Sequence, residues 1–414
     1  MKRMMALELK RVAKSRATLV LAAMALMLSI AMAFLVISFA RYYYPDETGE
    51  EAALKGMAAI RARSEMAKPI EGQVTPEKIK AVYETYREVY DAYGDDIPLQ
   101  ESFEKISPVS TILFRVREVY VNSATGVPVP LHEVSPDDAA DFYARRTERL
   151  RDIMANDYKD APAAQQQALA MNEKVETPFT YVYGIGDSDT DDYLTFCIFL
   201  LVMICVVITA PIFAGEYQSG ADDILRCTRY GRRRLAVVKL LSAILLTTVL
   251  FAVCVTVFLL IPYAAFGRES LKTSIQIVRS AVYFTPLTVG GAQTLTALAG
   301  LLSFLATICF TLLLSSRFNT SLTALAASIG ACLLPTVLWM AGSGANIENW
   351  LKFCLPSGGV GLGNSFYFEL TGLNFLQLGP LSVWSPYVIA VAAGIEMFLF
   401  FFLAIRSYCR HEAA

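Results

Sequence analysis

Few side chains in this 414-residue sequence are placed to do covalent or hydrolytic chemistry. No stretch matches the GxxxxGKS or GxxxxGKT pattern that cradles nucleotide phosphates, and the two histidines, His132 and His411, form no HExxH zinc motif. A nucleophile, a base and an orienting group are not visible together. The sequence therefore predicts a protein that is not an enzyme, with no metal site and no cofactor of its own.

An acidic cluster near the middle of the chain resembles a calcium-binding loop. It consists of Asp187, Asp189, Asp191 and Asp192. The glycine that such a loop needs is absent, and Ile198 stands where the twelfth residue should be glutamate. We therefore expect a solvated turn at a membrane edge.

The most informative polar stretch is the connecting segment, Phe213 to Lys239, which reads FAGEYQSGADDILRCTRYGRRRLAVVK. Ser219 and Asp222 have the spacing of a capping box, in which each side chain accepts a hydrogen bond from the start of a helix. Basic residues follow where the negative end of that helix would lie, and Gly231 suits its C-terminal end. The pattern predicts a helix from Gly220 to Tyr230.

A helix of that length spans about 16 Å, which is too short to cross a bilayer. We expect it to lie beside the membrane and to dock on another protein. The residues available for docking would be Ile224, Leu225 and Arg226. The alternative is a basic connector that simply follows the usual distribution of Lys and Arg and binds anionic lipid.

Six long apolar stretches surround this segment in a chain that is 55% hydrophobic and 18% charged. Each has about the 20 apolar residues that a membrane-spanning helix needs. The first is 24 residues long, longer than the core of a signal peptide, so we interpret it as an anchor helix that is not cleaved. The predicted spans are residues 17–40, 193–214, 240–265, 295–314, 322–341 and 387–405.

The segments between the spans differ in charge. Residues 41–192 carry a net charge of −12, contain no cysteine, and have helix-start signals at Thr75 and Ser135, which predicts a mainly helical extracytoplasmic domain. Lys and Arg concentrate in the other set of loops, so both termini are expected in the cytoplasm of a multi-pass cell-membrane protein. The remaining segments are expected to be a cytoplasmic interfacial helix (1–16), a cytoplasmic helix region (215–239), an outer loop (266–294), a cytoplasmic turn (315–321), an outer or re-entrant loop (342–386) and a cytoplasmic tail (406–414).

The predicted fold class is therefore all-α, a polytopic membrane protein with six transmembrane helices and a domain inserted between the first two. Glu396 is the one charge inside the apolar stretches, and a carboxylate at that depth is costly unless it faces protein or water. It either hydrogen-bonds inside the bundle or lines a transport path, for which Pro335 is a second candidate. A secondary transporter, or a membrane-anchored ligand sensor that uses the inserted domain, remains an alternative function.

At the connecting segment the sequence resembles the permease subunits of ABC-2 type ABC transporters. The family pattern has a Glu, a Gly four residues later, a hydrophobic pair, a Thr, a basic residue and a Lys that enters the next span. Ala221 stands where the family usually has a Thr after the Gly. The matching residues are Glu216, Gly220, Ile224, Leu225, Thr228, Arg232 and Lys239, to which Arg226 is added as a docking candidate.

The resemblance implies a permease that works as a dimer, with an identical copy or a sibling, and that transports an unknown substrate, usually outward. It also implies that the short helix is a coupling helix that inserts into partner ABC ATPase subunits, which bind the ATP. Membrane lipid is a further expected partner, and no nucleic acid is expected.

Overall fold

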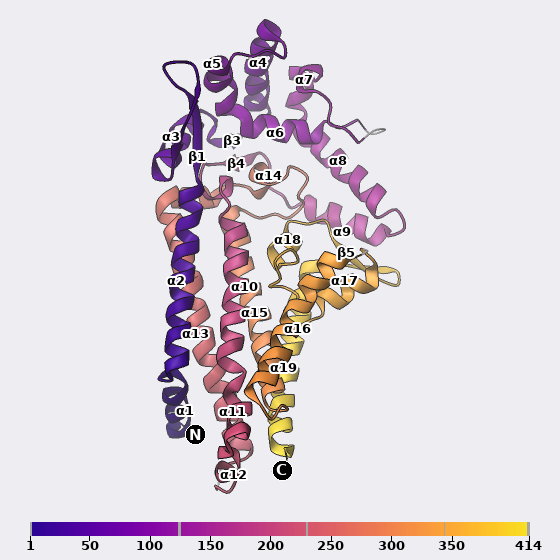
Figure 1. Ribbon diagram of the computed structural model, residues 1–414. Coiled ribbons are helices and arrows are strands. Elements are labelled where there is room, and N and C mark those ends of the chain that lie inside the picture. The colour runs from indigo at the N-terminus through magenta and orange to yellow at the C-terminus, as the bar shows by residue number, and fades with distance from the viewer. Residues whose placement is uncertain (1, 123–125, 229–230, 343, 412–414) are drawn as a thin grey trace.

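The protein is a bundle of long helices with a smaller domain at one end (Figure 1). The computed structural model describes residues 2–122, 126–228, 231–342 and 344–411. Six helices within these described residues are long and apolar enough to span a membrane, which confirms the predicted number. The spans are α2 (Arg16–Phe39), α10 with α11 (Thr190–Thr209 and Pro211–Ser219), α13 (Arg233–Phe266), α15 (Val289–Ser315), α16 (Ser321–Ala341) and α19 (Ser385–Arg410).

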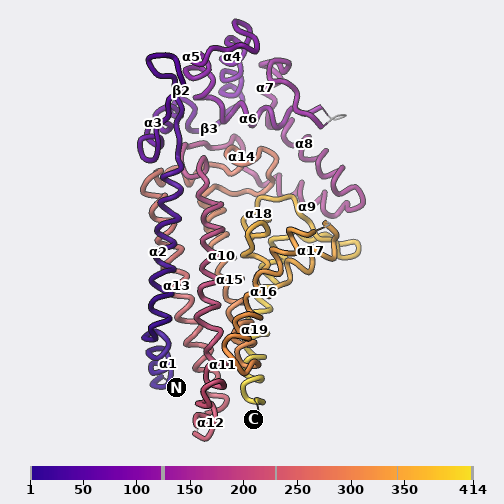
Figure 2. Tube along the Cα trace, in the orientation of Figure 1, coloured from indigo at the N-terminus to yellow at the C-terminus, as the bar shows by residue number. Residues whose placement is uncertain are grey.

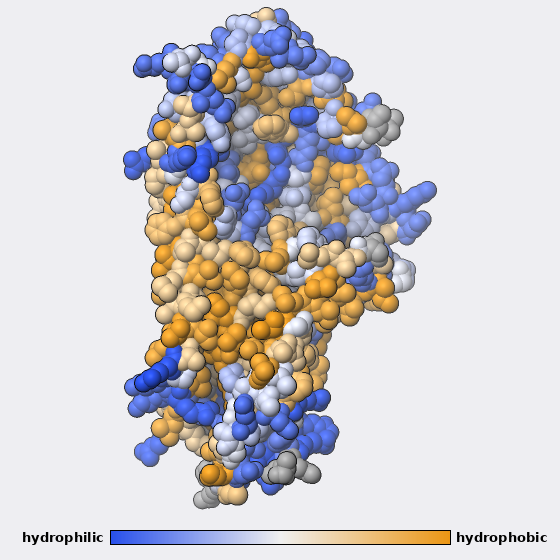
Figure 3. All heavy atoms as spheres, viewed as in Figure 1, coloured by the Kyte–Doolittle hydropathy of each residue, from blue (hydrophilic) through white to orange (hydrophobic). Residues whose placement is uncertain are grey.

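The two ends of the bundle differ in what they carry. Both chain termini lie at one end, with the short helices α1 (Lys2–Ala13) and α12 (Ala221–Arg226), and we call this the termini end (Figure 1). The residues between α2 and α10 form the inserted domain at the opposite end, which we call the domain end. The Cα trace shows the long helices running side by side between the two ends (Figure 2). On the visible face, apolar residues form a belt between two polar ends (Figure 3), as expected for a protein that sits in a bilayer.

Several helices begin at a side chain that satisfies a free backbone amide. Ser15 Oγ accepts a hydrogen bond from the Thr18 amide at 3.1 Å at the start of α2. Thr75 and Ser135 cap α4 and α7 in the same way, which confirms the two helix starts predicted for the inserted domain. These caps define where α2, α4 and α7 begin, which hydropathy alone does not determine to the residue.

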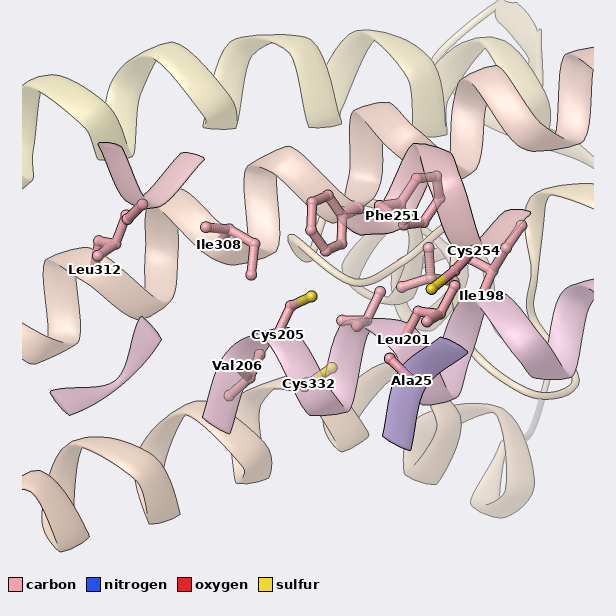
Figure 4. Close-up of a cluster of buried hydrophobic side chains, with 14 of the residues drawn as sticks. Ala25, Ile198, Leu201, Cys205, Val206, Phe251, Cys254, Ile308, Leu312 and Cys332 are labelled. Atoms are coloured by element: carbon pink, nitrogen blue, oxygen red, sulfur yellow. The ribbon is translucent and has the colours of Figure 1, made fainter. Parts of the chain in front are cut away.

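The interior of the bundle is filled by apolar side chains from several spans. Ala25, Leu201, Phe251, Ile308 and Cys332 come from five different helices and meet in one buried cluster (Figure 4). Helices α15 and α19 pack along much of their length. All eight cysteines are free, and the five that are buried fill the core as small side chains.

The inserted domain is mainly helical, with two small antiparallel sheets. Strand β1 pairs with β2, and β3 pairs with β4. Its elements are β1 (Arg41–Pro45), β2 (Glu51–Lys55), α3 (Met57–Ala67), β3 (Gly72–Val74), α4 (Pro76–Tyr93), α5 (Leu99–Glu101), α6 (Ser110–Val119), α7 (Pro136–Ala140), α8 (Phe142–Asp157), α9 (Pro162–Asn172) and β4 (Phe179–Tyr181).

Polar contacts fasten this domain to the loop that joins α13 to α15 and contains α14 (Ile275–Val278). Arg146, which is buried, donates to the carbonyl oxygens of Ala281 and Tyr283, the latter at 2.7 Å. Glu118 accepts from the Ala281 amide at 3.0 Å. Burial lowers the pKa of Arg146 to about 10, although Tyr143 and Glu118 oppose this shift. The domain and this loop therefore share hydrogen bonds that neither could satisfy alone.

The acidic cluster is only in part the solvated turn that the sequence predicted, because Asp189 and Asp192 are exposed but Asp191 is buried. Asp191 is only 2% exposed and accepts hydrogen bonds from Gln293 at 2.6 Å and from Tyr367 at 2.8 Å. Arg279 completes the set with an ion pair at 3.1 Å. A buried carboxylate is tolerated when it is paired and hydrogen-bonded, and these donors come from loops and spans distant in sequence.

The long segment between α16 and α19 is packed on the domain end. It contains α17 (Asn346–Phe353), α18 (Phe366–Leu370) and a hairpin of β5 (Phe375–Leu378) and β6 (Leu381–Trp384). Its glycine-rich stretch lies against the bundle, because a Cβ on Gly359 would meet Ser303 Oγ at 2.5 Å. Glycine at this position permits the close approach.

Candidate functional site

The connecting segment forms a sharp turn at the termini end of the bundle. Helix α11 ends at Gly220, which adopts a left-handed conformation with φ of 71°, and α12 begins at the next residue. Residues with a side chain rarely adopt this conformation, which accounts for glycine here. The chain then turns back toward the membrane and enters α13 at Arg233.

The predicted capping box does not form, and α12 is shorter than predicted. Ser219 Oγ donates to the Glu216 carbonyl at 3.2 Å, and no side chain caps the start of α12. Asp222 instead forms an ion pair with Arg226, four residues later, at 2.6 Å. The helix covers Ala221–Arg226, while Arg229 and Tyr230 lie outside the described residues. The Asp222 carboxylate is therefore held in an ion pair with Arg226 and does not take part in a capping box.

Arg226 anchors α12 to the C-terminal end of α19. Its guanidinium donates to the carbonyl oxygens of Tyr408, at 2.6 Å, and of His411. The same group lies 4.7 Å from the centre of the Tyr408 ring, a cation–π distance. Tyr217 on α11 stacks on His411 with ring centres 4.0 Å apart. The connecting segment is therefore attached to the last span as well as to the two spans that it joins.

A buried ionic cluster lies behind the turn. Glu216 is 6% exposed and Lys239 is 1% exposed, and their side chains form an ion pair. The second oxygen of Glu216 accepts from Arg11 of α1 at 2.7 Å, and Arg11 also pairs with Glu8. Both oxygens of the buried carboxylate are thus neutralised by cations from two other helices. The cluster ties α1, α11 and α13 together.

The residues predicted for docking differ strongly in exposure. Ile224 has 74% of its surface exposed, whereas Leu225 packs against the core of the bundle and Arg226 faces α19. Thr228 donates to the Leu225 carbonyl at 2.7 Å, closing the turn after α12. The segment therefore offers one apolar side chain to a partner and uses the other two as anchors.

An open cleft of about 900 Å³ lies beside α12. Arg226, Arg232, Asp223 and His411 contribute to its lining. The chain after α12 passes close to the backbone of that helix. A Cβ on Gly231 would lie 1.9 Å from the Leu225 carbonyl oxygen. Gly231 is thus needed for close packing and does not end α12 as a capping glycine.

The two transport-path candidates are not part of this site. Pro335 is a buried residue within α16, and Glu396 lies midway along α19. The Oε2 atom of Glu396 is buried and has no hydrogen-bond partner among the residues that the structure describes. Glu396 is near Cys354, whose pKa is raised by burial and then by this carboxylate. The structure brings the eight coupling candidates together at the termini end and leaves Pro335 and Glu396 elsewhere.

Three residues that sequence reasoning missed complete the site. They are Arg11, Tyr408 and His411, and each contacts the connecting segment from another part of the chain. The sequence offers one weak indication of these contacts. A cation and two aromatic residues lie near the chain ends, and such side chains can contact a loop that carries both acidic and basic residues. Across the described ranges, no group of His, Cys, Asp and Glu could hold a metal ion.

Most of the chain is similar to one known protein family. Residues 4–358 match the model of a family described as ABC-2 family transporter protein. The match covers α1, the inserted domain, the connecting segment and five of the six spans, and ends before α19. No curated protein matches the chain.

Proposed function

This chain belongs to the ABC-2 family of transporter proteins, and from that premise we propose that separate ATPase subunits dock on its connecting segment. Family membership makes the chain the membrane-spanning, permease component of an ABC transporter, and its six apolar spans make it a multi-pass membrane protein. In the proposed complex, ATP binds to the partner subunits. This chain supplies the path across the membrane.

The observation that supports the proposal is the contrast within α12. Ile224 is 74% exposed, whereas Asp222 beside it is buried and forms an ion pair with the partly buried Arg226. An exposed apolar side chain on a firmly held helix can fill a pocket of a partner without first being ordered, which lowers the entropic cost of binding. A push on α12 would reach α19 through Arg226, and would reach α13 and α1 through Glu216.

The direction and assembly of the transporter follow from the same proposal. The ATPase subunits require the termini end to face the cytoplasm, which agrees with the distribution of Lys and Arg in the sequence. The inserted domain would then lie outside the cell membrane. We propose outward transport by two permeases, identical or sibling, with two ATPase subunits.

The test uses the full chain purified from its native membrane with the partner that it retains. We expect Ile224→Asp to reduce co-purifying ATPase and substrate-stimulated ATP hydrolysis by about fivefold or more. Burial of an uncompensated charge at the interface costs about 1 to 3 kcal/mol, and 1.4 kcal/mol corresponds to a factor of ten. The matched control is Leu99→Asp in the inserted domain, where the side chain is 43% exposed. Normal ATPase association and activity in Ile224→Asp would reject the docking site.

A further inference from the structure

A second cleft, at the domain end, has no part in the proposed coupling. Its volume is about 910 Å³. The turn between α8 and α9 forms one wall, and the end of α16, helix α17 and strand β5 form the others. Figure 1 shows α9 and α17 facing each other at this point. Charged, amide and aromatic side chains line it together, which is a composition suited to a polar ligand.

The cleft contains a buried cation that forms no direct ion pair with a described carboxylate. Lys352 of α17 is only 7% exposed, and its ammonium donates to Asn349 Oδ1 at 3.0 Å. It also lies 4.4 Å from the centre of the Phe353 ring. Burial lowers the pKa of Lys352, and the nearby carboxylates of Glu369 and Glu348 offset part of this shift. An ammonium has three donors, so this one can still bind an anionic group.

A second donor in the same cleft is also unused. Gln377 of β5 lines the cleft, and its Oε1 accepts from Ser382 at 2.6 Å. Its Nε2 is buried and has no partner in the described part of the chain. Buried polar groups normally have a partner, so two under-used donors beside one cleft indicate a ligand rich in acceptor oxygens. A phosphate group meets this requirement.

The rim of the cleft carries both signs of charge, with carboxylates in excess. Asp157 and Asp160 are exposed on the α8–α9 turn with Lys159 between them, and Glu348 of α17 also contributes to the lining. These carboxylates would repel a ligand that is purely anionic. They favour a ligand that carries a positive, hydrogen-donating group a short distance from its phosphate, because charged hydrogen bonds are the stronger kind.

The position of α17 indicates that the cleft opens onto lipid. The side of α17 away from the cleft exposes Ile347 (81%) and Leu351 (52%), which is typical of a helix lying in the membrane interface. Trp339, also in the lining, is 48% exposed at the end of α16, where tryptophans gather at the headgroup level. Met340 beside it is 75% exposed. The apolar belt of Figure 3 supplies the surface along which acyl chains would run.

We propose that this cleft binds the head group of a membrane glycerophospholipid that carries a primary amine. The phosphate contacts Lys352, the amine lies between Asp157 and Asp160, and the acyl chains follow the exposed face of α16. This binding site rests on the membrane location of the chain and does not depend on ATPase docking.

The experiment is a lipid titration of the full chain. The protein is delipidated in detergent, and binding is measured by native mass spectrometry with phosphatidylethanolamine, phosphatidylcholine and phosphatidylglycerol of identical acyl chains. We expect the ethanolamine lipid to bind about tenfold more tightly than either of the others. Lys352→Gln should weaken the binding of all three lipids about tenfold, because all three carry the phosphate.

The exposed rim provides variants that leave the fold intact. Asp157→Asn combined with Asp160→Asn should abolish the preference for ethanolamine over choline while keeping phosphate-dependent binding. The matched control is Lys272→Gln, a lysine exposed on the loop between α13 and α15 and paired with Glu269, which should change nothing. Equal binding of all three lipids to the unaltered protein would overturn the proposal. Displacement of the lipid by a zwitterionic peptide at lower concentration would overturn it as well, in favour of a peptide site.

Discussion

Removal of the carboxylate from the ionic cluster of Glu216, Lys239 and Arg11 should destabilise the protein more than removal of the whole Glu216–Lys239 pair. In Glu216→Gln, the ammonium of Lys239 stays buried, with 1% exposure and 5.6 Å from the Phe213 ring, and loses its only carboxylate partner among the described residues. Breaking a buried ion pair in this way costs about 3 to 5 kcal/mol.

The double variant Glu216→Gln/Lys239→Met removes both buried charges, and replacement of a buried pair by apolar groups is often close to neutral. Arg11 needs no buried partner, because its side chain is 49% exposed and also pairs with Glu8. The double variant should therefore recover much of the loss. We expect a coupling energy between the two positions of about 2 to 4 kcal/mol.

The assay is a double-mutant cycle on unfolding in mixed micelles, with the secondary structure followed by circular dichroism. The exposed pair Glu269–Lys272 serves as the control, since surface pairs of this kind contribute about 0.2 to 1 kcal/mol. Additive losses at Glu216 and Lys239, with a coupling no larger than that of the control pair, would refute the reasoning.

Three further predictions concern single positions. Gly220→Ala should destabilise the protein by about 1 to 2 kcal/mol in the same unfolding assay, because φ is 71° and not because of a clash, whereas Gly330→Ala in the interior of α16 should not destabilise it. Burial raises the pKa of Asp187 from 3.8 to about 6, so the folded state holds this proton more tightly and is most stable below about pH 4. The contribution of this carboxyl to stability should fall by about 3 kcal/mol between about pH 4 and pH 6, and Asp187→Asn should flatten that part of the profile of melting temperature against pH. Glu396→Gln should raise the melting temperature and leave the pH dependence of transport unchanged, because the carboxyl has no described ion-pair partner; a shifted transport profile would give the residue a role in the path.

The spans could be predicted from sequence because they depend on local composition. An uninterrupted apolar stretch of about 20 residues has few stable states in a bilayer other than a helix. The helix starts at Thr75 and Ser135 were predictable for the same reason, since each cap bonds to an amide three residues away. The predicted ends of the spans differ from the structure by a few residues, where polar residues such as Arg233 extend the helix beyond the apolar core.

The arrangement of the candidate site could not be predicted, because its decisive contacts are long-range. Arg226 meets Tyr408 across 182 positions, and Arg11 meets Glu216 across 205. The capping box predicted at Ser219 does not form, because Asp222 pairs with Arg226 instead. The residue pattern at a helix start does not include that ion pair. Asp191 of the acidic cluster is buried for a similar reason, since Gln293 and Tyr367 donate hydrogen bonds to it from distant segments.

The most direct test of the proposed coupling is photo-cross-linking from the exposed residue of α12 in native membranes. A photoreactive phenylalanine derivative is incorporated at position 224 in the full chain, and a matched derivative at position 99 serves as the control. We predict that irradiation links position 224, and not position 99, to an ATPase that carries the phosphate-binding motif absent from this chain. Cross-links from position 224 to lipid alone, with the same ATPase present and active in the membrane, would contradict the assignment of α12 as the coupling helix.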